Sequence, residues 1–273
     1  MAAMSTPDGD KVFAGTVPKI YETFLVPLIF QPYANDLAKR LAARPVQRVL
    51  EIAAGTGVVT RALADKLPES ASIVATDLNQ AMLEQAISVG TRRPVEWRQG
   101  DAMQLMFADA SFDAVVCQFG VMFFPDKARA FAEVRRVLAP GGIFLFNAWD
   151  RIEENDFARV VTDSLASLFP GDPPRFMART PHGYHDVEAI TRDLRAAGFG
   201  DGSIDTLAKR SIAPSALDAA IAYCQGSPLR SEIESRGSLE EATRVAARAI
   251  ESAFGSGAVD GKIQAHVCMV ERD

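Results

Sequence analysis

The chain has 273 residues, of which 48% are hydrophobic and 23% charged, and its formal net charge is −6. This is the composition of a folded globular protein, so a disordered or low-complexity chain is excluded. The 29 basic residues are scattered among 35 acidic ones. Proteins that bind nucleic acid usually gather basic residues on one face, so nucleic acid is not expected as a partner.

The three cysteines, Cys117, Cys224 and Cys268, include no C-x-x-C pair. Neither a disulfide framework nor a zinc site is therefore predicted, and we expect no metal. The first residues lack the pattern of a signal peptide. The longest nearly uncharged stretch, residues 137–149, is shorter than the roughly 20 residues that a spanning helix needs. The sequence predicts a cytoplasmic protein without a membrane span and leaves its oligomeric state open.

Residues 46–150 alternate between strand-like apolar runs and helix-like segments and are predicted to form the core domain. The periodicity predicts strands at 46–53, 71–77, 95–100, 112–119 and 142–149, and helices at 58–67, 80–90 and 127–139. Asn79 is the expected cap of the second helix. This alternation predicts right-handed crossovers and a doubly wound, mostly parallel α/β sheet with helices on both faces.

The segments outside this core are expected to cover the sheet or to complete it. Residues 1–45 are predicted to form a helical cover, which Pro27 and Pro32 break into pieces. Residues 151–186 are expected to be a substrate-side insert. Residues 187–273 are expected to complete the sheet, with a helix at 187–200, strands at 203–212 and 262–272, and a mostly helical insert at 213–261.

The stretch VLEIAAGTGVVTRAL, residues 49–63, places a carboxylate and two glycines between a strand and a helix. Gly55 and Gly57 leave the backbone bare where a ligand could approach, and the following helix offers unpaired N–H groups. Ligands of open α/β sheets bind beyond the carboxyl ends of the strands. The stretch therefore indicates a nucleotide-type site, although glycines can also serve only to tighten the turn.

A dinucleotide-binding enzyme is the first alternative, because it uses a similar glycine-rich turn. Its fingerprint is G-x-G-x-x-G, whereas Gly55 begins G-T-G-V-V-T, with Thr60 in place of the third glycine. That glycine normally permits close packing of the helix on the strand. An NAD-linked oxidoreductase is therefore disfavoured but stays open. The sequence contains no phosphate-binding P-loop pattern.

Five motifs, in order, resemble those of class I S-adenosylmethionine-dependent methyltransferases. They are VLEIAAGTG (49–57), ATDLN (75–79), QGDAMQLMF (99–107), FDAVVCQFGVMFFPD (112–126) and EVRRVLAPGG (133–142). They are similar to the branch that includes the ubiquinone and menaquinone biosynthesis methyltransferases. The resemblance implies a seven-stranded Rossmann-like sheet whose last strand is antiparallel. It also implies S-adenosylmethionine as the cofactor and S-adenosylhomocysteine as the product. Ala53 departs from the pattern, because the family commonly has a glycine there.

The resemblance also implies which residues bind the cofactor. Asp77 is expected to accept hydrogen bonds from both ribose hydroxyls, a task for which a carboxylate is suited; the alternative is a helix-capping role. Asp101 and Ala102 are expected to meet the adenine, or else to form only a turn. Glu51 is expected to order the loop near the ammonium group. The other expected cofactor-binding residues are Tyr21, Ala53, Gly55, Thr56, Gly57, Leu78, Met82 and Gln118.

Methyl transfer from a sulfonium needs positioning and exclusion of water more than it needs a base. His182, Tyr184 and His185, in TPHGYHD, are candidates for acid or base work, and the alternative is a polar loop. His266 is expected to be structural. The candidates for substrate contacts are Phe30, Tyr33 and Met122. Met122 belongs to an apolar run with Phe119, Phe123 and Phe124, which core packing would also explain.

Together these features predict a methyltransferase that moves a methyl group to a small, largely apolar acceptor by in-line displacement. No N-P-P-Y-like tetrapeptide follows the fourth strand, which disfavours the nucleic-acid amino-methylating enzymes that use it. The methylated atom, oxygen, carbon or nitrogen, stays open. A relative that binds S-adenosylmethionine without methylating is a further alternative. The resemblance also implies that the segment 17–41 folds over the cofactor, with Tyr21 closing the pocket.

Overall fold

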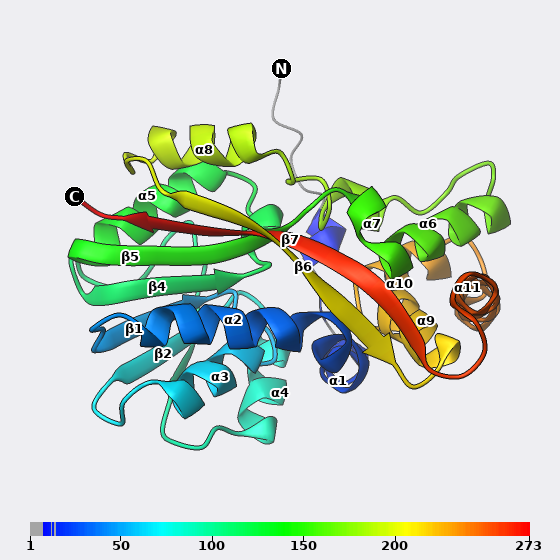
Figure 1. The fold of residues 1–273 in the computed structure, drawn as a ribbon, viewed down its shortest axis with the longest axis horizontal. Helices are drawn as coiled ribbons and strands as arrows, with labels where there is room; N and C mark the ends of the chain where they lie inside the picture. The colour runs from blue at the N-terminus through cyan, green and yellow to red at the C-terminus, as the bar shows by residue number, and fades with distance from the viewer. Residues whose placement is uncertain (1–7, 12, 14) are drawn as a thin grey trace.

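A seven-stranded sheet forms the centre of the protein (Figure 1). The computed structural model describes residues 8–11, 13 and 15–273. The strands are β1 (Arg48–Ile52), β2 (Ser72–Asp77), β3 (Glu96–Gln99), β4 (Phe112–Gln118), β5 (Leu138–Trp149), β6 (Ser203–Ala213) and β7 (Val259–Glu271). Their order is β3-β2-β1-β4-β5-β7-β6. Strands β1 to β5 pair in parallel, and β7 lies antiparallel between β5 and β6. The predicted fold class is confirmed.

Helices cover both faces of this sheet, as Figure 1 shows. One face carries α3 (Val58–Lys66) and α4 (Gln80–Val89), and the other carries α5 (Lys127–Val137) and α8 (Val187–Ala196). The side chain of Asp126 accepts a hydrogen bond at the start of α5, and Asp186 does the same for α8. Such caps satisfy N–H groups that a helix leaves unpaired at its first turn. Because β1 to β5 run parallel, their carboxyl ends lie at the same edge of the sheet.

The N-terminal cover is one continuous helical path that changes type. It comprises α1 (Val17–Ile20), the π-helix η2 (Tyr21–Phe30) and α2 (Gln31–Ala42), and a short 3-10 turn, η1 (Asp8–Lys11), precedes it. Pro27 lies inside the π-helical stretch and Pro32 in the first turn of α2. Proline lacks an N–H, so it fits the first turn of a helix, as at Pro32, whereas inside a helix, as at Pro27, it removes a backbone hydrogen bond and disturbs the regular path. The expected break is therefore a change of helix type and not a gap between pieces.

A group of helices, which we call the helical cap, stands where β6 and β7 extend beyond the rest of the sheet (Figure 1). The cap comprises α6 (Asp156–Leu168), α7 (Phe176–Arg179), α9 (Ala216–Gln225), α10 (Leu229–Glu234) and α11 (Leu239–Phe254). Short 3-10 turns, η3 (Val121–Phe123) and η4 (Ile152–Glu154), follow β4 and β5. The predicted helical insert between the last two strands therefore contributes α9, α10 and α11, which build one side of the ligand-facing edge.

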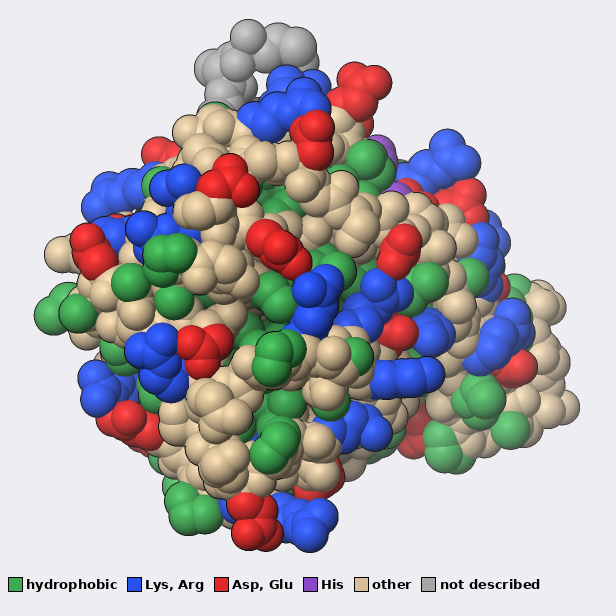
Figure 2. Space-filling view, turned by 60° about the vertical axis from the view of Figure 1, so that its left-hand side comes forward, with side chains coloured by type: hydrophobic (Ala, Val, Ile, Leu, Met, Phe, Trp, Pro, Cys, Tyr) green, Lys and Arg blue, Asp and Glu red, His purple; other side chains and the backbone are tan. Residues whose placement is uncertain are grey.

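The surface carries charges of both signs. On the face shown in Figure 2, basic side chains are interspersed with acidic ones and with apolar patches. Within the described residues, no helix is long and apolar enough to cross a membrane. The central strands β1 and β4 are buried on both faces, as expected of a parallel sheet covered by helices.

Gly57 has a packing role that the sequence motif does not reveal. Its φ is +83°, and it caps α3. A Cβ atom there would lie 2.8 Å from Cη2 of Trp97 and 3.2 Å from the Cβ of Ala86. The bare Cα therefore lets α4 and β3 pack against the start of α3. The close approach of these neighbouring side chains is therefore one reason for a glycine at position 57.

We expect Gly57→Ala to reduce the free energy of unfolding by about 2–5 kcal/mol, because left-handed strain adds to overpacking. Gly141→Ala is the matched control, since Gly141 has a φ of +74° but no atom within 4 Å of the added Cβ. The control should lose only about 1–2 kcal/mol. Urea denaturation measures both values, and equal losses would contradict the packing role.

Candidate functional site

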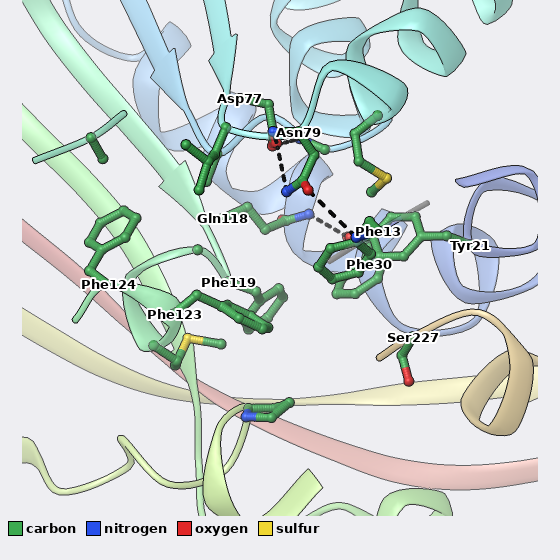
Figure 3. Close-up of a pocket in the computed structure, with 18 of the residues that line it drawn as sticks. Phe13, Tyr21, Phe30, Asp77, Asn79, Gln118, Phe119, Phe123, Phe124 and Ser227 are labelled. Carbon is green, nitrogen blue, oxygen red and sulfur yellow. Dashed lines mark hydrogen bonds between the residues drawn. The ribbon is translucent and has the colours of Figure 1, made fainter. Parts of the chain in front are cut away.

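A cavity of about 260 Å³ lies at the carboxyl edge of the sheet, between the core, the N-terminal cover and the helical cap (Figure 3). Five strands deliver a residue to its wall at or just after their carboxyl ends, namely Ala53, Asp77, Gly100, Gln118 and Trp149. This is the edge at which open α/β sheets bind ligands. The further predicted site residues in the wall are Tyr21, Phe30, Gly55, Leu78, Met82, Asp101, Ala102 and Met122.

Asp77 sits at the end of β2 and is 7% exposed. Its Oδ2 accepts a hydrogen bond from the Gly55 N–H at 2.8 Å, and its Oδ1 accepts one from the Asn79 N–H at 2.7 Å. Burial raises the pKa of this carboxyl, while the N–H donors of Asn79 and Gly55 act in the opposite direction. The carboxylate is therefore fixed in place at the cavity wall, in contact with the glycine loop.

Ala53 stands where the family commonly has a glycine, and Gly120 makes room for its methyl group. Ala53 has a φ of +53°, a conformation that favours glycine. A Cβ on Gly120 would lie 2.5 Å from the Cβ of Ala53 and 2.8 Å from the Sγ of Cys117. The missing side chain at Gly120 thus leaves room for the extra methyl group. Both residues line the cavity, so the substitution changes the packing of the wall without closing the site.

Glu51 lies behind the wall and not in it. It is 1% exposed, and its Oε2 accepts a hydrogen bond from the Thr60 hydroxyl at 2.6 Å. Burial raises its pKa to about 8, which the Thr60 hydrogen bond and the charge of Arg61 oppose. Thr60, at the position where the dinucleotide-binding fingerprint has its third glycine, therefore serves to hold the Glu51 carboxyl group. Thr56 and Gly57 are also absent from the wall, so none of these three predicted residues lines the cavity.

Gln118 offers an unused acceptor at the cavity. Its Nε2 donates to the carbonyl oxygen of Phe30 at 3.4 Å. Its Oε1 is buried and forms no hydrogen bond with the described residues. An unpaired buried oxygen is costly unless a ligand donates to it. Together with the Asp77 carboxylate, the Gln118 oxygen suits a cofactor that carries both a sugar diol and an ammonium group.

Aromatic side chains form the opposite half of the cavity. Phe119, which has a φ of +50°, stacks on Trp149 with ring centroids 3.7 Å apart and planes 3° from parallel. Asn147 Oδ1 accepts a hydrogen bond from the Phe119 N–H at 2.9 Å and so helps to hold this unusual backbone conformation. The wall here also contains Leu25, Ile29, Phe123, Phe124, Pro125, Phe176, Met177, Pro181, Tyr223 and Ser227. Among the described wall residues, the charged side chains are Asp77 and Asp101, both on the glycine-loop side.

Tyr33 is placed behind this aromatic wall, contrary to the prediction that it contacts substrate. It is fully buried, and its hydroxyl donates to the carbonyl oxygens of Leu207 at 2.9 Å and Ile263 at 3.3 Å. Its ring packs edge-on against Phe119 and Trp149. Tyr33 therefore supports the stacked pair from behind and fastens α2 to β6 and β7.

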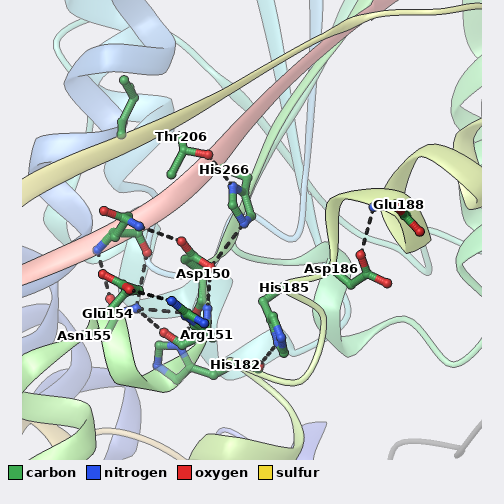
Figure 4. A network of polar contacts seen from close by, with 12 residues as sticks. Asp150, Arg151, Glu154, Asn155, His182, His185, Asp186, Glu188, Thr206 and His266 are labelled. Atoms are coloured by element: carbon green, nitrogen blue, oxygen red, sulfur yellow. Dashed lines mark hydrogen bonds and ion pairs between the residues drawn. The ribbon is translucent and has the colours of Figure 1, made fainter.

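The histidine and tyrosine side chains of the loop TPHGYHD do not line the cavity, although Pro181 of the same loop does. Figure 4 shows the polar network of the two histidines. His182 Nδ1 donates to the carbonyl oxygen of Asp150 at 2.8 Å, and burial lowers its pKa to about 4. The Tyr184 hydroxyl donates to Asp193 at 2.6 Å, and His185 Nδ1 donates to the carbonyl oxygen of His182 at 2.8 Å. The three candidate catalytic side chains are thus engaged within the protein and absent from the wall.

His266 takes part in the same network, with its Nδ1 2.9 Å from the Thr206 hydroxyl. Its Nε2 lies 3.3 Å from Asp150 Oδ1. The ring therefore ties β7 to β6 and to the end of β5, in agreement with a structural role. Within the described residues, no group of three or more His, Cys, Asp or Glu side chains is arranged to hold a metal ion.

The N-terminal cover closes one side of the cavity. The Tyr21 ring stacks on Phe30 with centroids 4.9 Å apart, and Phe13 meets Tyr21 edge-on (Figure 3). The Phe13 N–H donates to Asn79 Oδ1 at 3.5 Å. Asn79 occupies the predicted cap position of α4, but its side chain forms this contact and not a cap hydrogen bond. The cover thus contacts the loop that carries Asp77.

An ion triad fastens the cover to the helical cap. We call residues 8–11 and 13 the strap. Asp10, which is 4% exposed, accepts hydrogen bonds from Arg179 Nη2 at 2.6 Å and from the Thr180 hydroxyl. Arg179 also donates to Glu232 at 2.8 Å. The strap therefore connects α7 and α10 of the cap with Asn79 of the core, across the cavity.

Sequence reasoning missed the wall residues that come from outside the motifs. They are Phe13, Leu25, Ile29, Trp149, Phe176, Met177, Pro181, Tyr223 and Ser227. Trp149 had a usable signal, since it ends a predicted strand at the ligand-binding edge. The apolar run of Phe119, Met122, Phe123 and Phe124 lines the cavity, so core packing alone does not account for it. The cap residues had no local signal, because only the tertiary fold brings α7 and α9 to this edge.

Comparison with known proteins relates both sequence and fold to methyltransferases. Residues 50–146 match the family model "Methyltransferase domain". The demethylmenaquinone methyltransferase of Corynebacterium kroppenstedtii is 31% identical over 170 residues, covering 59% of this chain and 71% of the relative. That of Deinococcus radiodurans is 41% identical over 173 residues, covering 59% and 71%. The crystal structure of a putative methyltransferase from Bacillus halodurans aligns with 87% of this chain and with 98% of its own chain. The TM-score is 0.58 and the sequence identity 22%, so the two proteins share the fold.

These relatives cover the predicted motifs, and the alternative of an NAD-linked oxidoreductase finds no support among them. The residues at the cavity also fit S-adenosylmethionine, because its wall contains a fixed carboxylate, Asp77, at the end of β2 and an amide with an unpaired oxygen, Gln118, at the end of β4. The chain is an S-adenosylmethionine-dependent methyltransferase of class I and belongs to the family of the ubiquinone and menaquinone biosynthesis methyltransferases.

Proposed function

We propose that this methyltransferase acts on a small, planar, uncharged aromatic acceptor. The observation that carries the proposal is the stacked pair of Phe119 and Trp149 in a half-cavity whose described wall residues carry no charge. Flat aromatic surfaces bind flat rings by offset stacking and by burial of apolar area. A charged acceptor would lose its hydration there without gaining a partner.

The cofactor half of the cavity is proposed to hold S-adenosylmethionine along the strand ends. Asp77 would accept from the ribose hydroxyls, and Asp101 with the Ala102 N–H would meet the adenine. Leu78 and Met82 would pack against the adenine ring. The unpaired Oε1 of Gln118 supports a hydrogen bond from the ammonium group, next to the backbone of Ala53 and Gly55. Tyr21 would close the site, while Glu51, Thr56 and Gly57 would support the loop from behind.

The chain's own residues would contribute to the reaction by orienting the acceptor and by excluding water from the cavity. S-adenosylmethionine, when bound, supplies a methyl group already activated on a sulfonium. Phe119 and Trp149 would hold the acceptor ring, while Tyr21, Phe30 and Phe13 would keep water out. Excluding water and fixing the approach geometry account for much of the acceleration available to such a displacement. We assign no general base, because the acceptor half contains no His, Asp, Glu, Lys or Cys among its described wall residues.

The relatives guide the choice of acceptors for a test. Two of them are named demethylmenaquinone methyltransferases, and a reduced naphthoquinone is a planar, uncharged ring system. We expect methyl-labelled S-adenosylmethionine to label 1,4-naphthalenediol or 2-naphthol in the presence of the enzyme. Histamine and a linear fatty acid are the charged and non-planar controls. Transfer to a control, with none to either ring compound, would contradict the proposed acceptor class.

Replacement of the ribose-binding carboxylate should weaken cofactor binding. For Asp77→Asn we expect roughly a 10- to 100-fold loss of affinity for S-adenosylhomocysteine, because charge-assisted hydrogen bonds are lost. Asp113→Asn is the control, since Asp113 pairs with Arg48 at the amino end of β4, away from the cavity. Isothermal titration calorimetry measures both affinities. Equal affinities in two folded variants would contradict the role of Asp77.

The strap should gate access to the cavity. We expect S-adenosylhomocysteine to slow chymotrypsin cleavage after Phe13 in the wild type, because the ligand lies beneath the strap. Arg179→Met removes the partner of Asp10 and should speed cleavage about tenfold, through more frequent local opening. Arg195→Met, which affects only an exposed pair with Asp201, is the control. Identical cleavage of the wild type with and without the ligand would contradict gating.

A further inference from the structure

We propose that Tyr223 is the residue that orients the acceptor, by donating a hydrogen bond from its hydroxyl to an oxygen on the acceptor ring. This inference rests on the proposed function, since it names the polar recognition element of the same acceptor half. It narrows the acceptor from planar aromatic molecules in general to rings that carry an oxygen, such as phenols, naphthols and quinols.

Tyr223 reaches the cavity from the helical cap and not from the methyltransferase core. It lies near the end of α9, is 3% exposed and belongs to the cavity wall. Phe119 and Trp149 come from the ends of β4 and β5, whereas Tyr223 comes from the cap, so the acceptor half combines residues of the core and of the cap. Figure 3 shows Ser227, one turn further along the chain, on this side of the cavity, away from Asp77. The position is thus suited to contact the acceptor and not the ribose.

In the acceptor half, the count of polar groups singles out the Tyr223 hydroxyl. The Tyr21 hydroxyl belongs to the cofactor half, since it lies 3.7 Å from the position of a Cβ on Gly55. Ser227 also lines this half, but its hydroxyl already donates to the Tyr223 carbonyl oxygen at 3.0 Å and accepts from the Leu229 N–H at 3.3 Å. The Tyr223 hydroxyl forms no hydrogen bond with any residue that the structure describes. By contrast, Tyr33 and Tyr184, the tyrosines outside the wall, both donate to protein oxygens.

The Tyr223 hydroxyl is not among the fully buried unpaired atoms of the described residues, so it keeps accessible surface in the cavity wall. A ligand that covers it must replace its hydrogen bond to water, and a ligand oxygen would do so. An apolar site with one or two placed polar groups is also the usual composition of a small-molecule pocket. The stacked pair would bind any flat ring, whereas one directional donor fixes how the ring is turned. The ring atom that faces the methyl group is then set by its distance from the oxygen held at Tyr223.

The protonation state of Tyr223 limits it to this positioning role. Burial raises the pKa of its hydroxyl, and the negative charge of Asp156 adds to the effect. The hydroxyl therefore stays protonated across the physiological range and serves as a donor. It cannot serve as the base that removes a proton from the acceptor.

The test compares two ligands that differ by one hydroxyl group. Binding of 2-naphthol and of naphthalene is measured by fluorescence quenching, with the protein saturated with S-adenosylhomocysteine. We expect the wild type to prefer 2-naphthol about tenfold, as one net hydrogen bond allows. Tyr223→Phe should lose that preference and keep its affinity for naphthalene. The control Tyr184→Phe, which removes a hydroxyl outside the wall, should behave as the wild type does.

Each outcome distinguishes the inference from the proposed function. If the wild type binds both ligands and Tyr223→Phe keeps the full preference for 2-naphthol, the assignment of Tyr223 is wrong while the planar acceptor class stands. An equal loss of both ligands in Tyr223→Phe, with calorimetry showing intact S-adenosylhomocysteine binding, would mean a packing role and would also overturn the assignment. If the wild type binds neither ring, the acceptor class fails and the inference fails with it.

Discussion

The hydrogen bond from the Gly55 N–H to the Asp77 carboxylate is the interaction on which the site depends. It joins the loop after β1 to the end of β2, so two neighbouring strands are fixed relative to each other where a ligand would bind. A charge-assisted bond of this kind is stronger than one between neutral groups. Because Oδ1 is held in turn by the Asn79 N–H, the carboxylate has one orientation. The same residue thus orders the glycine loop and offers a negative charge to the cavity.

The cavity combines two parts with different origins. The core strands supply the fixed polar groups, Asp77 and the unpaired Gln118 oxygen, as well as the stacked pair of Phe119 and Trp149. The helical cap and the N-terminal cover supply the opposing walls. The Asp10–Arg179–Glu232 triad fastens these two added parts to each other. The sheet builds the cofactor half, and the added helices complete the acceptor half. Proteins with this fold can therefore act on different acceptors while they keep the same transfer chemistry.

The sheet could be predicted because each strand and helix has its own local periodicity, and because parallel connections allow few topologies. Asp77, Gly55 and Gln118 were found for the same reason: residues at strand ends share one edge. The packing role of Gly57 could not be predicted, since its contacts with Trp97 and Ala86 are tertiary. Tyr33 was expected at the acceptor because it lies in the N-terminal cover, and His182 because of its acid–base chemistry, but both donate within the protein. Tyr223 had no local signal at all, because the fold alone brings α9 over the aromatic wall.

The most direct test of the central claim is a crystal structure of the protein with S-adenosylhomocysteine. The account predicts that both ribose hydroxyls lie within hydrogen-bond distance of the Asp77 carboxylate. It also predicts the amino group of the ligand next to Gln118 Oε1, and its sulfur directed toward the half-cavity of Phe119 and Trp149. A ribose that contacts other residues, with Asp77 still bonded only to Gly55 and Asn79, would contradict the account.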